Sequence, residues 1–403
     1  MNKKHDVTVL GAGLAGCSTA LKLAQLGYRV LLIDKSSYPV SGASRHNEGK
    51  LHLGYIYAAD PKHKTYRKIL EGSLQFLDLT QQLTGVSPTQ IPRSQPFFYA
   101  IPADSQLSVE QIYKHFARVD EYVASHGDHT SHIQLETVLP ADGTMVAGIF
   151  SDEIQAVIQT SEIALDPSYV ASIYGAAVLA EPLIDFLGGH EVTMVEDSGG
   201  AYNINAQSAE GTIRIEAQAV ANCLWENRLH IDALVGFTSS KPWLWRWKAT
   251  LSFETPSTLS APSTTLLLGP YGDYVPYSSG RSYLSWYPSC LVGSTSQLDA
   301  NPLQDAIETY DDQRIRRESF EGLGRYIPAL IHDPQLYRRA TVSGGYIMAL
   351  GTTDIEDPDS GLHQRHEIGP SIDGTWLSLE TGKFCTAPMF GVQAANMLHE
   401  RLR

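Results

Sequence analysis

A glycine-rich turn near the start of the chain constrains its fold more than any other feature. Gly11, Gly13 and Gly16 directly follow the apolar stretch 6–10, and small and apolar residues then recur at helical spacing over 14–26. Such a turn is a strong indication only when a buried strand precedes it and a helix follows it, as here. The sequence therefore predicts a strand, a tight turn and a helix that packs closely on the strand.

The residues of this unit have the properties that a dinucleotide-binding site needs. Gly27 ends the helix, and a second apolar stretch, 29–33, ends at Asp34. The glycines let the backbone approach a pyrophosphate, and the helix N-terminus attracts its negative charge. The carboxylate of Asp34 is placed to accept hydrogen bonds from a ribose. We expect a dinucleotide to contact Gly11, Gly13, Leu14, Ala15, Gly16, Asp34 and Lys35.

The length and composition are those of a globular protein with more than one domain. Of 403 residues, 43% are hydrophobic and 18% are charged, so the chain can bury a large core. The net charge of −14 argues against a nucleic acid or an anionic membrane as a partner. The four cysteines are scattered, and no apolar run reaches the length of a membrane span. Because the first strand leaves no room for a signal peptide, we expect a cytoplasmic protein.

The order of the predicted elements indicates two domains, one of them discontinuous. Helices are predicted over 60–82, 166–187, 303–318 and 388–401, and short strands over 191–195, 201–206, 212–217 and 219–223. The stretch 243–290 is aromatic and strand-like. We expect a discontinuous α/β nucleotide-binding domain of the Rossmann type, formed by 1–80, 166–235 and 341–403, and an inserted antiparallel-sheet substrate domain, formed by 81–165 and 236–340.

Five segments together resemble one superfamily. They are the residues 11–20, 43–52, 166–167, 220–225 and 381–388. In this order they are similar to the superfamily of D-amino acid oxidase, glycine oxidase and sarcosine oxidase, which are FAD-dependent oxidoreductases. The resemblance covers the whole chain and is more specific for the fold and the cofactor than for the substrate. One departure is Asp34, where many relatives carry glutamate, but the shorter carboxylate still reaches a ribose.

The resemblance implies FAD as the cofactor and a glutathione-reductase-like fold for the domain that binds it. The segment 43–52 resembles the family's loop between pyrophosphate and isoalloxazine, and 381–388 resembles its last loop, around the flavin. The final helix would direct its positive end at the ring, and Lys383 would add a charge there unless it is a solvated loop residue. The further cofactor contacts implied in this way are Ser44, Arg45, Asn47, Asn222, Trp225, Gly382, Lys383 and Phe384.

Two histidines are candidates for the chemistry. The superfamily removes a hydride from a carbon that bears nitrogen or oxygen, so the resemblance implies a small amine, amino acid or 2-hydroxy acid as substrate, with oxygen or another acceptor reoxidising the flavin. An alcohol must lose its proton as the hydride leaves, which requires a base such as His52 or His46. An amine enters deprotonated and needs none. Either histidine has alternative roles as a flavin contact, a covalent attachment point or a structural residue.

An arginine and a tyrosine on one predicted strand are candidates for holding the substrate. Strand alternation places Arg281 and Tyr283 on the same face, and an arginine beside a tyrosine suits a carboxylate clamp. The alternative is an exposed arginine at the end of a hairpin, because Ser278-Ser279-Gly280 is typical of a turn.

Other features leave alternatives open. His126, His129 and His132 share a regular spacing, but the residues between them favour a surface turn, and we predict no metal site. Strand alternation over 243–248 predicts that the tryptophans pack inward and that Arg246 and Lys248 face outward.

Two other functions stay open: an NAD-dependent dehydrogenase, and a flavin-binding protein whose cofactor is structural or relays electrons. The sequence does not predict an oligomeric state.

Overall fold

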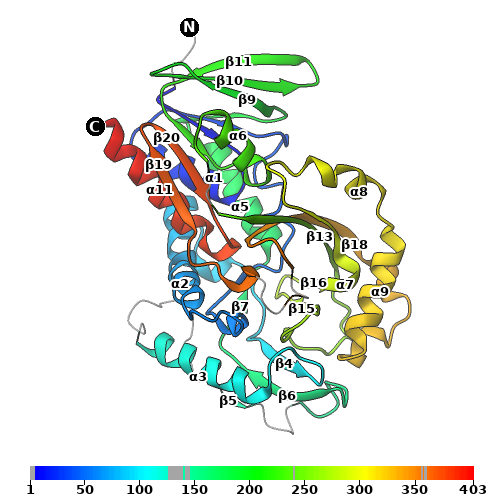
Figure 1. Cartoon of the computed structure of the whole chain (residues 1–403). Helices are drawn as coiled ribbons and strands as arrows, with labels where there is room; N and C mark the ends of the chain where they lie inside the picture. Colours follow the sequence, from blue (N-terminus) through cyan, green and yellow to red (C-terminus); the bar gives the residue numbers. More distant parts are fainter. Residues whose placement is uncertain (1–4, 126–138, 141–145, 239–240, 355–356, 358–360) are drawn as a thin grey trace.

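A computed structural model gives the fold of the chain. It describes residues 5–125, 139–140, 146–238, 241–354, 357 and 361–403. Figure 1 shows two layers of structure side by side, with both termini on the layer that holds helix α11 and the small strands β9 to β11. Among the described residues, no helix combines the length and the apolar character that a membrane crossing requires.

A six-stranded sheet forms the centre of the first layer. Its order is β19-β20-β12-β1-β2-β8, and β1 lies between two parallel neighbours, β2 and β12. Only β19, at the edge, runs antiparallel to its partner β20. The strands are β1 Val7–Leu10, β2 Val30–Ile33, β8 Ile184–Leu187, β12 Val220–Asn222, β19 Gly369–Asp373 and β20 Trp376–Glu380. Strands from the start, middle and end of the chain thus form the parallel sheet that the sequence predicts.

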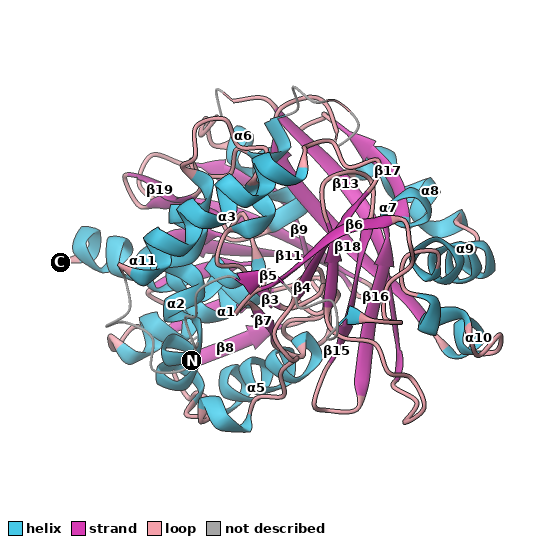
Figure 2. Cartoon of the chain, turned by 90° about the horizontal axis from the view of Figure 1, so that it is seen from below, coloured by secondary structure: helices cyan, strands magenta, loops and turns pink. Residues whose placement is uncertain are grey.

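Helices cover this sheet and bury its apolar residues. Helix α1 packs against α11, α5 and α2, and Figure 2 shows α1, α2 and α11 together on one side of the molecule. Helix α2 buries Ile69, Leu70 and Leu77, which recur at helical spacing. The helices of this layer are α1 Leu14–Gln25, α2 Thr65–Thr84, α5 Pro167–Ala180, α6 Arg228–Leu234 and α11 Ala387–Leu402.

The predicted helix over 166–187 is wrong in its second half. The side chain of Asp166 caps α5 by accepting a hydrogen bond from the Ser168 amide, as the sequence indicates, but the helix ends at Ala180. Pro182 lies just beyond this end, and proline cannot continue a helix. The residues that follow form β8, which extends the parallel sheet beside β2. A tertiary pairing therefore overrides the local helical pattern.

A nine-stranded sheet forms the second layer. Its path is β17-β13-β16-β15-β14-β4-β6-β5, and β18 also pairs with β13 along its length. The strands are β4 Phe98–Pro102, β5 Leu139–Pro140, β6 Ile154–Gln159, β13 Trp243–Glu254, β14 Thr264–Leu266, β15 Gly272–Pro276, β16 Arg281–Trp286, β17 Leu291–Thr295 and β18 Thr341–Leu350. The residues of β18 belong to this sheet, although the sequence analysis assigned 341–403 to the nucleotide-binding domain.

Smaller elements complete the two layers. The antiparallel strands β9 Glu191–Asp197, β10 Tyr202–Ser208 and β11 Gly211–Ala217 confirm the predicted strands in this region. A two-stranded ladder joins β3 Lys50–Leu51 to β7 Ile163–Ala164. The other helices are α3 Val109–Ala124, α7 Tyr287–Cys290, α8 Gln304–Thr309, α9 Asp312–Gly324 and α10 Leu336–Arg339. The single helix predicted over 303–318 is two helices, because Tyr310 is extended and the side chain of Asp311 caps α9.

The predicted outward orientation of Arg246 on β13 is wrong. Arg246 is 3% exposed and its Nη1 atom lies 2.8 Å from Asp354 Oδ1. Trp245 and Trp247, which point to the opposite face of the strand, are buried as well, so both faces are covered here. Lys248 is half-buried and its Nζ atom donates to Ser285 Oγ at 3.1 Å. A buried sheet does not follow the simple alternation of apolar-inward and polar-outward residues.

The close approach of the first turn to α1 leads to a stability prediction. A Cβ atom on Gly16 would lie 1.8 Å from the carbonyl oxygen of Gly11, and a backbone atom cannot move aside cheaply. We expect Gly16→Ala to lower the free energy of unfolding by about 2–3 kcal/mol, measured by denaturant unfolding without added cofactor. The control is Gly42→Ala, because a Cβ there meets nothing within 4 Å. Equal stability of the two variants would contradict this reading of the turn.

Candidate functional site

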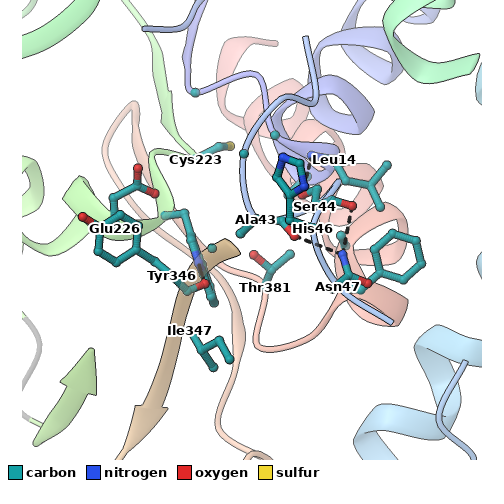
Figure 3. Close-up of a pocket in the computed structure, with 18 of the residues that line it drawn as sticks. Leu14, Ala43, Ser44, His46, Asn47, Cys223, Glu226, Tyr346, Ile347 and Thr381 are labelled. Carbon is teal, nitrogen blue, oxygen red and sulfur yellow. Dashed lines mark hydrogen bonds between the residues drawn. The ribbon is translucent and has the colours of Figure 1, made fainter. Parts of the chain in front are cut away.

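One large cavity runs along the carboxyl ends of β1 and β2 and continues to the large sheet. It encloses about 1520 Å³, including space open to solvent. Gly11 to Ala15 border it on one side, Tyr346 and Ile347 of β18 on another, and Thr381 to Phe384 close it (Figure 3). Ligands of open parallel sheets bind in a crevice at the carboxyl ends of the strands, where the strand order reverses. The cavity occupies this position, since β1 has β2 on one side and β12 on the other.

The nucleotide-binding turn is held in place by the acid that ends β2. Asp34 Oδ2 accepts a hydrogen bond from the Ala12 amide at 2.6 Å, and its Oδ1 accepts one from Ser36 at 2.7 Å. Lys35 lies at the rim and pairs with Glu226 at 2.8 Å. The charge of Glu226 raises the pKa of Lys35 to about 12, although burial opposes the shift. Asp34 therefore orders the turn and also borders the cavity.

The loop that follows Ser41 is shaped by its own polar side chains. Ser44 Oγ accepts a hydrogen bond from the Leu14 amide at 3.1 Å, in the first turn of α1 (Figure 3). Asn47 Nδ2 donates to the carbonyl oxygens of Ala43 and Ser44, and its Oδ1 atom accepts from the Gly49 amide. Asn47 lines the cavity, but its amide group is engaged in folding the loop.

Strand β18 of the large sheet lies directly against this loop. A Cβ atom on Gly345 would lie 2.8 Å from Ala43 Cα, so only glycine permits the approach. The next residue, Tyr346, accepts a hydrogen bond at its carbonyl oxygen from Trp225 Nε1 at 2.8 Å. Tyr346 and Ile347 project into the cavity in Figure 3. The two layers of the molecule therefore meet at the cavity wall.

The final loop and helix close the opposite end. Gly382 has a φ of 68°, which favours glycine, and Arg365 Nη1 donates to its carbonyl oxygen at 3.0 Å. Phe384 packs on Phe76 of α2, with ring centroids 5.0 Å apart. Helix α11 begins at Ala387, which lines the cavity. Its positive N-terminal end therefore faces the cavity, as the sequence predicts.

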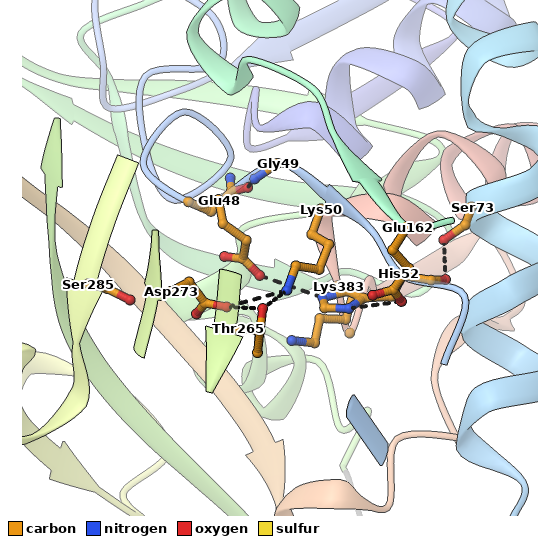
Figure 4. A network of polar contacts seen from close by, with 12 residues as sticks. Glu48, Gly49, Lys50, His52, Ser73, Glu162, Thr265, Asp273, Ser285 and Lys383 are labelled. Carbon is orange, nitrogen blue, oxygen red and sulfur yellow. Dashed lines mark hydrogen bonds and ion pairs between the residues drawn. The ribbon is translucent and has the colours of Figure 1, made fainter. Parts of the chain in front are cut away.

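A cluster of buried charges lies at the inner end of the cavity (Figure 4). His52 Nε2 lies 3.5 Å from Glu48 Oε1, and Lys50 Nζ lies 3.3 Å from Asp273 Oδ1. Lys50 also donates to Thr265 Oγ1 and lies 4.0 Å from the centre of the Phe97 ring. Neither ring nitrogen of His52 has a hydrogen-bond partner among the described residues. Buried polar atoms are usually paired, so these nitrogens indicate a site built to receive a ligand.

The charges of this cluster shift one another's pKa values. Burial and the charge of Lys383 lower the pKa of His52, although Glu48 and Glu162 oppose them. Burial and the charge of Arg365 lower the pKa of Lys383 to about 8, against the opposing effect of Glu48. Burial would raise the pKa of Glu48, but His52 and Lys383 hold it well below its usual range. At neutral pH the cluster therefore combines an uncharged imidazole with a protonated lysine.

Most of the predicted site residues line this cavity. Four do not: Arg45 and Arg281 border a second cavity, Asn222 is buried at the end of β12, and Gly16 lies inside α1. Asn222 is fully buried, and its Nδ2 atom donates to the Arg228 carbonyl oxygen and to Asp232 Oδ1. The predicted residues that line the main cavity are Gly11, Gly13, Leu14, Ala15, Asp34, Lys35, Ser44, His46, Asn47, His52, Trp225, Tyr283, Gly382, Lys383 and Phe384. Gly16 packs against the turn from inside α1.

The second cavity adjoins the first and contains the predicted arginine. Arg281, Arg45 and Tyr277 border it, and His46 and Tyr283 are shared with the main cavity. Arg281 is exposed. Burial and the charge of Arg45 lower the pKa of His46. A carboxylate clamp formed by Arg281 would therefore act only on a substrate that reaches from one cavity into the other.

Sequence reasoning did not assign several residues of the charged cluster. Glu48 and Lys50 line the main cavity together with the predicted His52, and the spacing of two between these residues is typical of one face of an extended segment. This alternating spacing is visible in the sequence and could have indicated Glu48 and Lys50 as neighbours of His52. Arg365 and Glu162 carry no comparable signal, because the fold alone brings them here. No group of three or more metal-binding side chains occurs among the described residues, and His126, His129 and His132 lie outside them.

Comparison with known proteins decides the family. Residues 6–397 match the model of the DAO family, described as FAD dependent oxidoreductase. The chain belongs to this family. An FAD-dependent monooxygenase of Fusarium mangiferae is 22% identical over 351 residues, which are 85% of this chain and 82% of the relative. The cofactor is therefore FAD, which decides against the NAD-dependent alternative.

Solved structures show the same fold. Iminodiacetate oxidase from Chelativorans sp. BNC1 has 16% identity and a TM-score of 0.68, with 98% of this chain and 95% of that chain covered. L-α-Glycerophosphate oxidase from Mycoplasma pneumoniae, solved with FAD bound, has 14% identity and a TM-score of 0.66 over the same shares. The predicted combination of a Rossmann-type domain and an antiparallel sheet is confirmed.

The residues around the main cavity fit FAD. The glycine turn and the start of α1 leave room for a pyrophosphate without side chains, and Asp34 is available to a ribose. The loop 43–47, Tyr346 and Phe384 provide walls for a flat ring. His52, whose ring nitrogens have no hydrogen-bond partner among the described residues, also lines this cavity, beside Lys383 (Figure 4).

The pKa of Lys383 leads to a prediction about anion binding. Because this pKa is about 8, the ammonium is lost as pH rises through that value. We expect small unreactive carboxylates to bind the FAD-loaded protein less tightly above pH 8, measured by the change in flavin absorbance. Lys383→Met should bind them about tenfold more weakly and without this pH dependence. The control is Lys241→Met, at a surface ion pair; an unchanged pH dependence in Lys383→Met would contradict the assignment.

Proposed function

We propose that this FAD-dependent oxidoreductase acts on a small carboxylic acid and oxidises the carbon that bears its hydroxyl or amino group. The observation that carries the proposal is the cluster at the inner end of the cavity, in which an unpaired, uncharged histidine faces buried cations. His52 supplies a base, and Lys383 and Arg365 supply positive charge for a carboxylate. When bound, FAD supplies the two-electron acceptor for the hydride that leaves the substrate carbon.

Residues of the chain bind the substrate carboxylate, accept the proton and stabilise the charge that forms. Lys383 attracts the carboxylate, since no hydrogen bond or ion pair engages its ammonium among the described residues. A ring nitrogen of His52 accepts the hydroxyl proton as the C–H bond breaks, so that the alcohol becomes a carbonyl and the imidazole becomes charged. Glu48, 3.5 Å from Nε2, stabilises that positive charge.

A 2-hydroxy acid requires both the carboxylate-binding charge and the base of this site, whereas an amino acid requires only the charge. An alcohol needs a base, and the lowered pKa of His52 keeps the imidazole free to accept a proton at neutral pH. An amine that enters uncharged leaves that proton-accepting role unused. Amino acid oxidation remains the second candidate function, because the carboxylate anchor serves both substrates equally.

The test is anaerobic reduction of the bound flavin by a panel of 2-hydroxy acids, amino acids and N-methyl amines. We expect 2-hydroxy acids to bleach the flavin, and His52→Asn to slow this reduction by about 100-fold while the flavin stays bound. Reduction by amines alone, at equal rates in both proteins, would support the second candidate and make His52 a flavin contact. Failure of every donor would favour a structural or electron-relaying cofactor and overturn the proposal.

A further inference from the structure

A buried glutamate lies on the side of His52 that faces away from Glu48. Glu162 is 0% exposed, and its Oε1 atom lies 3.9 Å from His52 Nδ1. Oε1 also accepts hydrogen bonds from the amides of Leu53 and Gly54, at 2.5 and 3.3 Å. The hydroxyl of Tyr99 donates to Oε2. Three donors thus hold one carboxylate in a fixed position beside the imidazole.

The two-stranded ladder explains why Glu162 meets His52. In this antiparallel pair Lys50 lies opposite Ala164, and Leu51 lies opposite Ile163. His52 directly follows β3 and Glu162 directly precedes β7, so the next step of the same register brings them together. Ser73 of α2 fixes the other side, since its Oγ atom donates to the His52 carbonyl oxygen at 2.6 Å. Both residues are therefore positioned through the backbone.

The two glutamates beside His52 differ in how freely their side chains can move. Glu48 lines the cavity and its side chain is 24% exposed. Glu162 does not border the cavity and cannot change position without breaking its three hydrogen bonds. A fixed negative charge near Nδ1 favours a proton on that nitrogen. The other nitrogen, Nε2, lies 3.5 Å from Oε1 of Glu48, a side chain that lines the cavity and is not held by backbone amides.

We propose that Glu162 is a positioning residue that holds the His52 imidazole with its proton on Nδ1 and so presents Nε2 to the cavity as the proton acceptor. The separation of 3.9 Å is too long for a hydrogen bond, so Glu162 acts through its charge. That charge is effective because the carboxylate and the ring are both buried, where solvent screens little. The role in proton transfer rests on the function proposed above; the control of the imidazole by Glu162 does not.

Several other ionisable groups face His52 and must be considered with Glu162. Lys383 and Lys50 lower its pKa, whereas Glu48 and Glu162 raise it. The Tyr57 ring centre lies 6.0 Å away, and burial keeps the pKa of its phenol well above the usual range. Among the described residues, these groups are Glu48 and Lys50 on the histidine's own segment, Tyr57, Glu162 before β7, and Lys383 and Cys385 on the last loop.

The experiment is a histidine titration by NMR in FAD-loaded protein labelled with ¹³C and ¹⁵N in its histidines. Of the 14 histidines, His52 is identified as the signal that His52→Asn removes. We expect the wild-type ring to carry its proton on Nδ1. Glu162→Gln should lower the titration midpoint by about one pH unit and populate the Nε2-protonated form. Glu216→Gln is the control, since this exposed carboxylate on β11 should leave the midpoint unchanged.

A second variant keeps the proposal testable if Glu162→Gln does not fold. Tyr99→Phe keeps the buried ring and removes one donor to Glu162, so the carboxylate retains more charge density and the midpoint should rise. Midpoints that move in opposite directions in the two variants would not follow from a loss of packing. An unchanged midpoint and an unchanged tautomer in a folded variant, verified by thermal melting, would overturn the proposal.

The result is independent of the test of function. The NMR titration needs no substrate, so it reports on Glu162 even if no donor reduces the flavin. Conversely, if His52→Asn abolishes flavin reduction while Glu162→Gln leaves the titration unchanged, the base is retained and Glu162 has only a structural role.

Discussion

The contact between α1 and the turn that precedes it is the constraint on which the rest of this structure depends. No side chain fits between Gly16 and the Gly11 carbonyl oxygen, so the helix starts close to the end of β1. Its positive end therefore lies at the carboxyl edge of the parallel sheet. Asp34 fixes the same turn from β2 through the Ala12 amide. The nucleotide half of the cavity follows from these few backbone contacts.

The other half of the cavity depends on where the large sheet meets the nucleotide layer. Gly345 lies so close to Ala43 that β18 forms a wall of the cavity, and Tyr283 of β16 separates the two cavities. Gly345 and Ala43 are far apart in the chain and meet only in the folded protein. A change in the packing of the large sheet would therefore alter the substrate side of the cavity and leave the glycine turn intact.

Burying several charges in one cluster is costly unless they compensate one another. Here Lys50 is compensated by Asp273, and Glu48 by the charges of Lys383 and Lys50. Burial and the charge of Arg365 lower the pKa of Lys383 to about 8, since Glu48 offsets them only in part. The carboxylate of the proposed substrate would add negative charge to this cluster.

The sequence by itself determined the nucleotide half of this protein. The residues from Gly11 to Asp34 form a local unit with β1, a turn, α1 and β2, and the contact of Gly16 with the Gly11 carbonyl oxygen lies within that unit. The loop from Ser44 to His52 and the last loop around Lys383 were predicted from their resemblance to loops of the family, and residues of both line the cavity.

Only the tertiary structure decided the substrate half. Arg281 was chosen from strand alternation, but its strand lies between two cavities and directs it into the second. Residues 184–187 have a helical pattern, yet pairing with β2 makes them a strand. Glu162 reaches His52 only through the register of a two-residue ladder. The physical reason is common to all three: burial and pairing between distant segments outweigh the preferences of the local sequence.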